Sequence, residues 1–279
     1  DVAVMWHADG WWALETPHLP NDRLNYSETV RGVHRALWHL GVPVDFAAPD
    51  AALDQYKLVL VPSMFGMDDT TVRNLEDYVD GGGRLCVWPF SGVADENMHV
   101  VSGGYPGQLR SLLGVRVEEF HPLGPDDTVT LSNGTIGDMW SEYMTLEGAE
   151  ATSTYVGGLL AGSPAATRRT HGSGQAYYVS TMPEPASLQA MVARLCDDAG
   201  VRRPLGVQPP PGTEVIVRRG AAADYVFVLN HSDQKVELSG PGEDLITSTA
   251  TTGGLTLDPG GYAVVRTSDA SPSAGWRLG

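Results

Sequence analysis

Apolar runs and helix-spaced apolar positions alternate through the first two thirds of the chain. Lys57–Pro62 and Arg84–Phe90 are apolar runs without alternation, which is typical of strands that helices cover on both faces. Between them, apolar residues recur at helical spacing over Val72–Val79. The pattern predicts a strand–helix–strand unit of a parallel sheet. Function in such sheets usually lies beyond the carboxyl ends of the strands, so the loops at 63–67 and 91–97 are the first candidates.

The same order of elements recurs on either side of this unit. Before it, the pattern predicts a strand at Val2–Met5, a helix over Ser27–Leu40 with Ser27 as its N-cap, and a strand at Val42–Phe46. After it, the pattern predicts strands at Val115–Phe120, Thr128–Leu131, Ala151–Leu160 and Gly174–Ser180, and a helix at Ser187–Ala199. This order predicts an α/β domain with a doubly wound parallel sheet.

The last third of the chain has a different pattern. Residues 202–212 read RRPLGVQPPPG, a proline-rich stretch that disfavours helix and interior strand. Short alternating strands follow, predicted at Glu214–Arg218, Tyr225–Asn230, Lys235–Leu238, Leu245–Ser248, Leu255–Leu257 and Tyr262–Arg266. We therefore predict an α/β domain at 1–203, a linker at 204–212, a small antiparallel β-sandwich or barrel at 213–268 and a flexible tail at 269–279.

Charge and cysteine content argue against several kinds of partner. The 279 residues carry 18 basic and 34 acidic side chains, a formal net charge of −16, whereas nucleic acids and anionic membranes select basic surfaces. No stretch has the length and hydrophobicity of a transmembrane helix, no leader precedes the first strand, and the missing start methionine suggests a piece of a longer protein. Cys86 and Cys196 form neither a disulfide framework nor a metal-ligand spacing. We expect a cytoplasmic protein without a metal.

An aromatic and acidic segment follows the first strand, and we expect it to be a long loop. Its candidate residues are Trp6, His7, Asp9, Trp11, Trp12 and Glu15. Tryptophan beside carboxylate is typical of a sugar subsite, where the ring stacks on the pyranose face. Tandem tryptophans also anchor protein interfaces or pack internally. The sequence leaves these three interpretations open.

The polar loop after the Arg84–Phe90 strand carries the remaining candidates, Ser91, Asp95, Glu96 and Tyr105. Ser91 follows a buried strand, where a nucleophile elbow could lie, but the G-x-S-x-G motif is missing and no cysteine occupies the position. Asp95 and Glu96 are sequence neighbours and do not form the opposed pair of a glycosidase. The glycines at 102–107 lack dinucleotide-binding spacing. The sequence predicts no catalytic residue and no cofactor.

Four motifs, WWALE at 11–15, RALW at 35–38, SGVADE at 91–96 and GGYPGQLR at 103–110, resemble in order and spacing the region after the catalytic barrel in family 42 glycoside hydrolases, the bacterial β-galactosidases. The β-rich end of the chain resembles the C-terminal domain of that family. The resemblance implies a flavodoxin-like or class I glutamine-amidotransferase-like α/β domain without the active cysteine, which assembles trimers, followed by a small all-β domain.

The resemblance also implies what this chain lacks. The family's two catalytic glutamates lie on an N-terminal barrel that would hydrolyse terminal β-D-galactosides with retention, and none of that barrel is present. The expected partners are further copies of the chain, most simply as a trimer, and the chain's own or a neighbouring barrel, with the galactoside bound only through the parent enzyme. The alternative is an independent carbohydrate-binding module or hydrolase on an amidotransferase-like scaffold.

Exposed apolar loops are a second reason to expect self-association. Seven large apolar residues fall in or beside predicted loops: Trp6, Trp11, Trp12, Met64, Phe65, Met67 and Trp140. In a monomer they would expose a larger contiguous apolar area than soluble proteins usually show. Contact between copies would bury that area.

Overall fold

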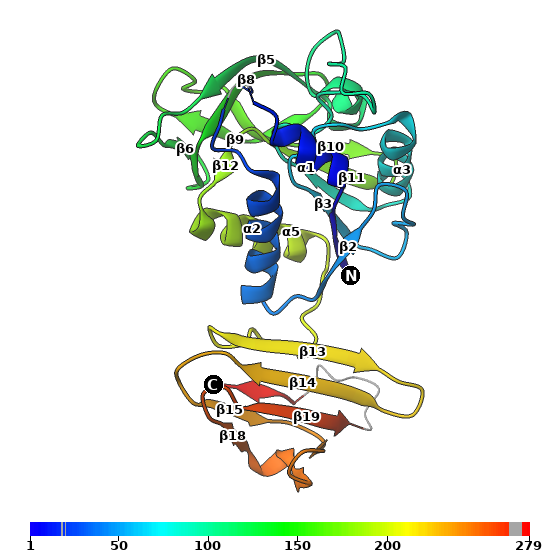
Figure 1. Ribbon diagram of the computed structural model, residues 1–279, viewed down its shortest axis with the longest axis vertical. Coiled ribbons are helices and arrows are strands. Elements are labelled where there is room, and N and C mark those ends of the chain that lie inside the picture. Colours follow the sequence, from blue (N-terminus) through cyan, green and yellow to red (C-terminus); the bar gives the residue numbers. More distant parts are fainter. Residues whose placement is uncertain (18, 20, 268–274) are drawn as a thin grey trace. The chain divides into compact units, whose positions relative to one another are not determined.

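A computed structural model describes residues 1–17, 19, 21–267 and 275–279. The chain forms two compact units, residues 1–34 with 44–200, and residues 35–43 with 201–279 (Figure 1). The domain limits expected from the proline-rich stretch stay predictions.

The first unit is built on a ten-stranded mixed sheet with the order β12-β7-β6-β9-β10-β11-β4-β3-β1-β2. Its parallel part consists of β2 (Val44–Ala47), β1 (Val2–Met5), β3 (Leu58–Val61), β4 (Arg84–Val87) and β11 (Gly174–Val179). Every residue of β1 and β3 is buried, as their apolar runs predict. The order 2-1-3-4-11 is that of flavodoxin-like sheets, so the predicted α/β fold is confirmed. The finer likeness to glutamine amidotransferases stays a prediction.

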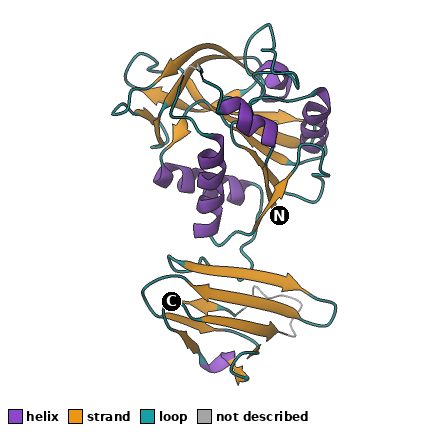
Figure 2. Ribbon diagram, viewed as in Figure 1, coloured by secondary structure: helices purple, strands orange, loops and turns teal. Residues whose placement is uncertain are grey.

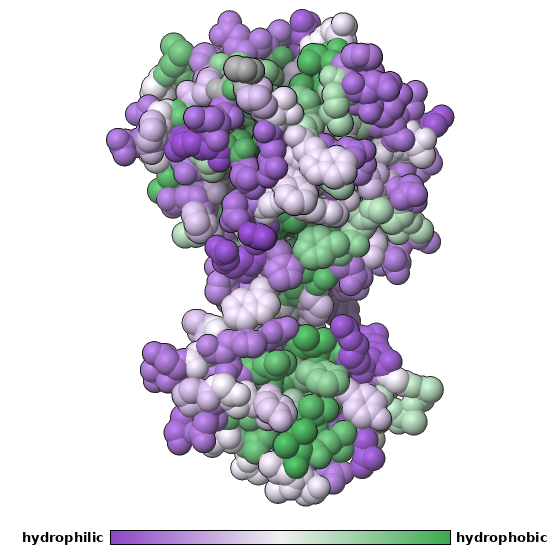
Figure 3. All heavy atoms as spheres, in the orientation of Figure 1, coloured by the Kyte–Doolittle hydropathy of each residue, from purple (hydrophilic) through white to green (hydrophobic). Residues whose placement is uncertain are grey.

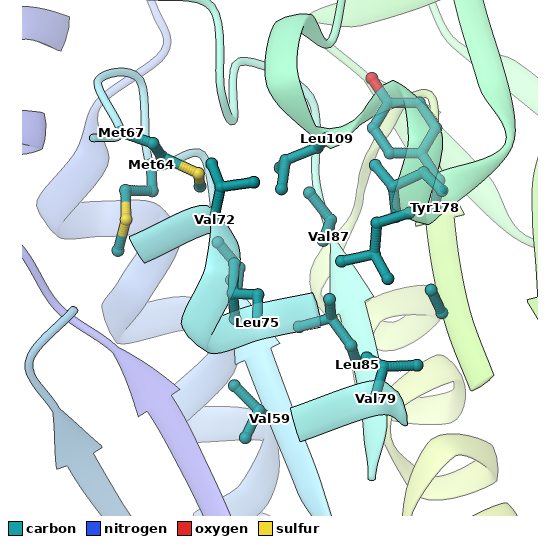
Figure 4. Close-up of a cluster of buried hydrophobic side chains, with 14 of the residues drawn as sticks. Val59, Met64, Met67, Val72, Leu75, Val79, Leu85, Val87, Leu109 and Tyr178 are labelled. Atoms are coloured by element: carbon teal, nitrogen blue, oxygen red, sulfur yellow. The ribbon is translucent and has the colours of Figure 1, made fainter. Parts of the chain in front are cut away.

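Two short helices cover one face of the parallel strands. Helix α3 (Asp69–Asp80) begins after Asp68, whose Oδ1 accepts a hydrogen bond from Thr71 N at 2.7 Å. The 3₁₀ turn η1 (Gly107–Leu109) leads into α4 (Arg110–Leu113). Figure 4 shows the apolar cluster that these helices bury against the sheet; its members include Val59, Val72, Leu75, Val79, Leu85, Val87 and Leu109.

Helices α2 (Tyr26–His39) and α5 (Pro185–Asp198) match two of the predicted helices. They approach each other closely, since a Cβ on Gly32 of α2 would lie 3.4 Å from Leu188 Cδ2 of α5. The predicted N-cap of α2 is wrong. Asn25 Oδ1, one residue before the helix, accepts from Glu28 N at 3.0 Å, so Ser27 lies within the first turn.

The other half of the sheet is antiparallel. Its strands are β10 (Pro164–His171), β9 (Glu150–Val156), β6 (Val129–Leu131), β7 (Ile136–Asp138) and β12 (Met182–Pro183), and a separate ribbon pairs β5 (Val115–Pro122) with β8 (Trp140–Leu146) (Figure 2). The sequence did not predict β7, β8, β10 or β12. Strand β10 reads PAATRRTH and is only half-buried, so neither an apolar run nor a clear alternation marks it.

The second unit consists of two antiparallel sheets, as the predicted sandwich requires. One contains β13 (Thr213–Arg219), β14 (Asp224–Asn230), β19 (Tyr262–Thr267), β16 (Glu243–Asp244) and β17 (Thr249–Ala250), and the other β18 (Leu255–Leu257), β15 (Val236–Ser239) and β20 (Arg277–Leu278). The 3₁₀ turn η2 (Thr251–Gly253) precedes β18. Val226, Val228, Leu238 and Val265 are among its core residues. Hydrophobic side chains also gather on the face of this unit visible in Figure 3.

Two expectations for the second unit are corrected. The strand expected at Leu245–Ser248 is a turn, because the carboxylate of Asp244 accepts hydrogen bonds from the backbone N–H groups of Ile246 and Thr247. Of the tail expected at 269–279, residues up to 274 lie outside the described residues. In the remainder, Trp276 is buried and Leu278 pairs with Leu238, so this part is an ordered strand.

Candidate functional site

The segment after β1 forms helix α1 (Ala8–Leu14) and not the expected loop. Gly10, Ala13 and Leu14 form its buried side, and a Cβ on Gly10 would lie 3.8 Å from both Met64 Cγ and Phe65 N of the loop after β3. The helix therefore lies directly on the carboxyl edge of the parallel sheet, at the switch point between β1 and β3 where such folds bind ligands. His18 lies outside the described residues.

The three tryptophans of the segment after β1 divide into a packed pair, Trp6 and Trp11, and an exposed one, Trp12. Trp6 contacts Trp11, with ring centroids 5.9 Å apart, and Tyr26, at 5.1 Å. The indole N–H of Trp11 donates to Glu15 Oε1 at 2.5 Å, one helical turn away. Trp12 is 64% exposed. The pairing of tryptophan with carboxylate, interpreted above as possible sugar-subsite chemistry, is therefore an internal hydrogen bond of this segment.

His7 and Asp9 lie at the start of α1. His7 Nε2 lies 3.5 Å from Asp9 Oδ2, while His7 Nδ1 is buried and has no hydrogen-bond partner within the described ranges. The backbone N–H of His7 donates to the Tyr26 hydroxyl at 3.1 Å. Burial raises the pKa of Tyr26 to about 12, against a smaller opposing effect of that hydrogen bond. The Tyr26 hydroxyl therefore stays protonated, and the side chain supports the start of the helix.

Ser91 is a structural residue in this fold. It is fully buried, its Oγ accepts from Met64 N at 3.1 Å, and its hydroxyl donates to Val61 O at 3.3 Å. The residue before it, Phe90, has φ +64°, the left-handed backbone of a sharp turn after a strand. Ser91 joins the loops after β3 and β4, and its hydroxyl is occupied by backbone groups.

Asp95 and Glu96 have separate roles in the loop after β4. Asp95 Oδ1 accepts from the backbone N–H groups of Asn97 at 2.8 Å and His99 at 2.9 Å. These hydrogen bonds, chiefly that of His99, lower the pKa of Asp95. Glu96 is exposed, and its Oε1 accepts from Asn97 Nδ2 at 3.3 Å. Asp95 therefore shapes the loop, and Glu96 remains available on the surface.

Tyr105 lies in the core beside a buried acid that the sequence did not indicate. Its ring meets Phe120 edge-on at 5.1 Å, and Glu142 on β8 lies near it. Glu142 is fully buried and accepts from Trp140 Nε1 at 2.9 Å and the Tyr178 hydroxyl at 2.7 Å. Burial raises the pKa of Glu142 to about 8, with the hydrogen bonds opposing it, so the acid is neutral near pH 7. One feature of the sequence could have identified Glu142. Its alternate spacing with Trp140 and Met144 places an acid on the same strand face as two large apolar residues.

Together these segments form one surface at the carboxyl edge. Backbone hydrogen bonds join Gly92 N to Met64 O and Val93 N to Phe65 O, and α1 lies on the same 64–65 turn. Trp12, Met98 and Val100 are its exposed apolar side chains. We call these three residues, with Glu96, the carboxyl-edge surface.

The expected exposure of other loop residues is wrong. Met64, Met67 and Trp140 are each at most 2% exposed, because the loops after β3 and β4 fold back over the sheet and Trp140 lies on strand β8. The apolar surface at this edge is thus smaller than the sequence suggested.

In the described ranges, no three His, Cys, Asp or Glu side chains come together in a way that could hold a metal ion. No helix formed by these residues has the length and apolar character needed to cross a membrane.

Two families of glycosidase domains match this chain. Residues 1–202 match the family described as beta-galactosidase trimerisation domain, and residues 212–267 match the beta-galactosidase C-terminal domain. The chain therefore belongs to the glycoside hydrolase family 42 β-galactosidases and comprises their trimerisation and C-terminal domains.

Known relatives agree with this assignment. The chain is 39% identical over 265 residues to a beta-galactosidase of an Arthrobacter species, covering 95% of this chain and 38% of the relative. The crystal structure of a beta-galactosidase from Bacillus circulans sp. alkalophilus superposes with a TM-score of 0.90 at 31% identity, covering 95% of this chain and 41% of that one. The structure of Gan42B, a GH42 beta-galactosidase from G. stearothermophilus, gives a TM-score of 0.89 at 26% identity, covering 96% of this chain and 40% of that one. The chain spans about two fifths of the length of these relatives.

Proposed function

We propose that the first unit assembles three copies of a longer β-galactosidase polypeptide. The observation that carries the proposal is the match of residues 1–202 to the trimerisation family. The longer enzyme would hydrolyse terminal β-D-galactosides with retention, using carboxylates outside this chain. The relatives' names support the substrate class. We place the enzyme in the cytoplasm, where thiols such as the buried Cys86 stay reduced.

The carboxyl-edge surface is proposed to face a catalytic barrel, of the same or a neighbouring polypeptide, and to form part of the wall of its substrate pocket. Trp12 supplies a large exposed ring, and Glu96 supplies an exposed acid on the same loop as Met98 and Val100. Aromatic rings on rigid supports are effective anchors at interfaces. The candidates His7, Asp9, Trp11, Glu15, Ser91 and Tyr105 would then support this surface or line its edge.

The packing beneath α1 explains how Trp12 is held in place. Trp6 lies between Trp11 and Tyr26, and the Tyr26 hydroxyl accepts from His7 N at the first residue before the helix. Because these contacts fix the start of α1, they also fix the stretch of backbone that carries Trp12. A rigid support of this kind keeps a wall residue in position without direct contact with the reacting atoms.

A pair of substitutions in the full-length gene product tests the proposal. We expect Trp12→Ala to raise KM for a chromogenic β-galactoside about tenfold, or to reduce the fraction of trimer, because it removes the ring that faces the barrel. The control Leu159→Ala removes a side chain that is 85% exposed in another turn of the same unit, and it should change neither quantity. Kinetics and mass that are unaltered in Trp12→Ala would refute the assignment of this surface.

A further inference from the structure

A cavity of about 270 Å³ lies within the first unit, between α5 and strands β4, β9, β10 and β11. It lies away from the carboxyl-edge surface and shares no residue with it. Its apolar wall comes from strand residues that point toward α5 and from the buried side of that helix: Cys86, Ala166, Val179, Met191 and Leu195.

The polar groups of this cavity carry a net positive charge. Arg168 on β10 and Arg194 on α5 line it together with Asp198 and the hydroxyl-bearing ring of Tyr177. Arg168 has a partner, since its Nη2 lies 3.3 Å from Glu150 Oε2, a carboxylate whose side chain is 76% exposed. Exposed ion pairs of this kind contribute little to the free energy of unfolding, and their side chains readily exchange partners.

Arg194 differs from Arg168. Across the described ranges, no hydrogen bond or ion pair joins its guanidinium to another residue. Because Arg168 is paired with Glu150, the guanidinium of Arg194 is the group that would meet a ligand, and together with the apolar wall it suits an anion with an apolar body. Arginine is the preferred protein partner of carboxylates because its planar fork matches their two oxygens.

We propose that this cavity binds a small apolar carboxylate. The apolar body would lie against Ala166, Val179 and Met191, and the carboxylate would meet the guanidinium of Arg194, with Arg168 nearby. Ligand sites typically combine a mostly apolar wall with a few polar groups that fix orientation, and this cavity has both. The site is independent of the assembly role and of galactoside hydrolysis.

A second and larger cavity, of about 540 Å³, does not support the same inference. It lies at the amino ends of the parallel strands and is lined by Lys57, Asn74 and Gly81–Gly83, among others. Lys57 Nζ already contacts Asp1 Oδ2 at 3.0 Å and Gly200 O at 3.1 Å. The amide of Asn74 donates to Pro49 O and Ala51 O. The donors of Lys57 and Asn74 are thus used within the protein.

Titration of the chain with benzoate tests the proposal, with binding followed by calorimetry and by protein NMR shifts. We expect one saturable site per chain. Arg194→Gln should weaken benzoate binding about tenfold, the cost of one charge-assisted hydrogen-bonded contact. Ala166→Leu, which fills the cavity from β10, should abolish it. The matched control Arg73→Gln, an exposed arginine on α3, should leave binding unchanged.

Three results would overturn the proposal. The first is no saturable benzoate binding by the unaltered chain. The second is binding that Arg194→Gln and Ala166→Leu leave unchanged, which would place benzoate elsewhere. The third is binding of benzyl alcohol as tight as that of benzoate, which would show that the guanidinium groups do not recognise a carboxylate. Arg194 is exposed on α5, so its variant keeps the test informative if Ala166→Leu fails to fold.

Discussion

Glu142→Gln is expected to make the chain more stable than the unaltered protein at pH 8, by on the order of 4 kcal/mol, while the two are similar near pH 4.5. Glu142 is fully buried, and burial raises its pKa from 4.5 to about 8. The folded protein therefore keeps a proton that the unfolded chain releases from pH 4.5 upward. This contribution to stability is complete below pH 4.5 and is lost as the pH rises toward 8. Glutamine stays neutral and lacks this dependence.

The neighbours of Glu142 do not titrate in this pH range. The hydroxyl groups of Tyr105, Tyr155 and Tyr178 face it, and burial raises the pKa of each above its ordinary value. Urea unfolding followed by tryptophan fluorescence at pH 5 and pH 8 measures the effect. Glu150→Gln, on an exposed side chain of β9, is the control and should show no such gain. If the free energy of unfolding depended equally on pH in Glu142→Gln and in the unaltered chain, Glu142 would not be a buried acid that stays neutral in the folded protein.

Gly174→Ala is expected to destabilise the first unit by more than about 3 kcal/mol, or to prevent its folding. Gly174 begins β11, and a Cβ there would overlap the carbonyl oxygens of Val79 and Gly83. Both are backbone atoms at the junction of α3 and β4, so relief would require the helix end to move away from the sheet.

The matched control for this prediction is Gly32→Ala. Gly32 lies within α2, where a Cβ would make an ordinary contact of 3.4 Å with Leu188 Cδ2. Alanine at this position should stabilise the helix by roughly 0.5–1 kcal/mol. Midpoints of thermal unfolding compare the two variants. A Gly174→Ala midpoint equal to that of the unaltered chain would show that the strand and helix are less tightly packed than described.

The parallel half of the sheet was predictable because its signals are local. Leu58–Val61 is a continuous apolar strand, and α3 has a cap and a helical apolar period. The antiparallel half was less predictable, because β10 mixes small and charged residues whose burial depends on the partners β9 and β11. Pairing between strands far apart in the sequence leaves little trace in either segment.

The candidate site was predictable in position and not in detail. The strand–helix–strand pattern located the carboxyl edge, and α1 and the loop after β4 do lie there. The exposure of single residues could not be predicted. Trp11 is partly covered through its hydrogen bond to Glu15, whereas its neighbour Trp12 points outward, because successive residues of a helix face different directions. Tyr105 and Glu142 meet in the core only through tertiary packing.

The mass of the chain in solution tests the central claim, assembly into trimers, most directly. Light scattering across a concentration series at moderate salt, which screens the −16 charge on each chain, should show the mass of three 29.8 kDa chains at the higher concentrations. A mass of one chain at every concentration would contradict assembly by these domains.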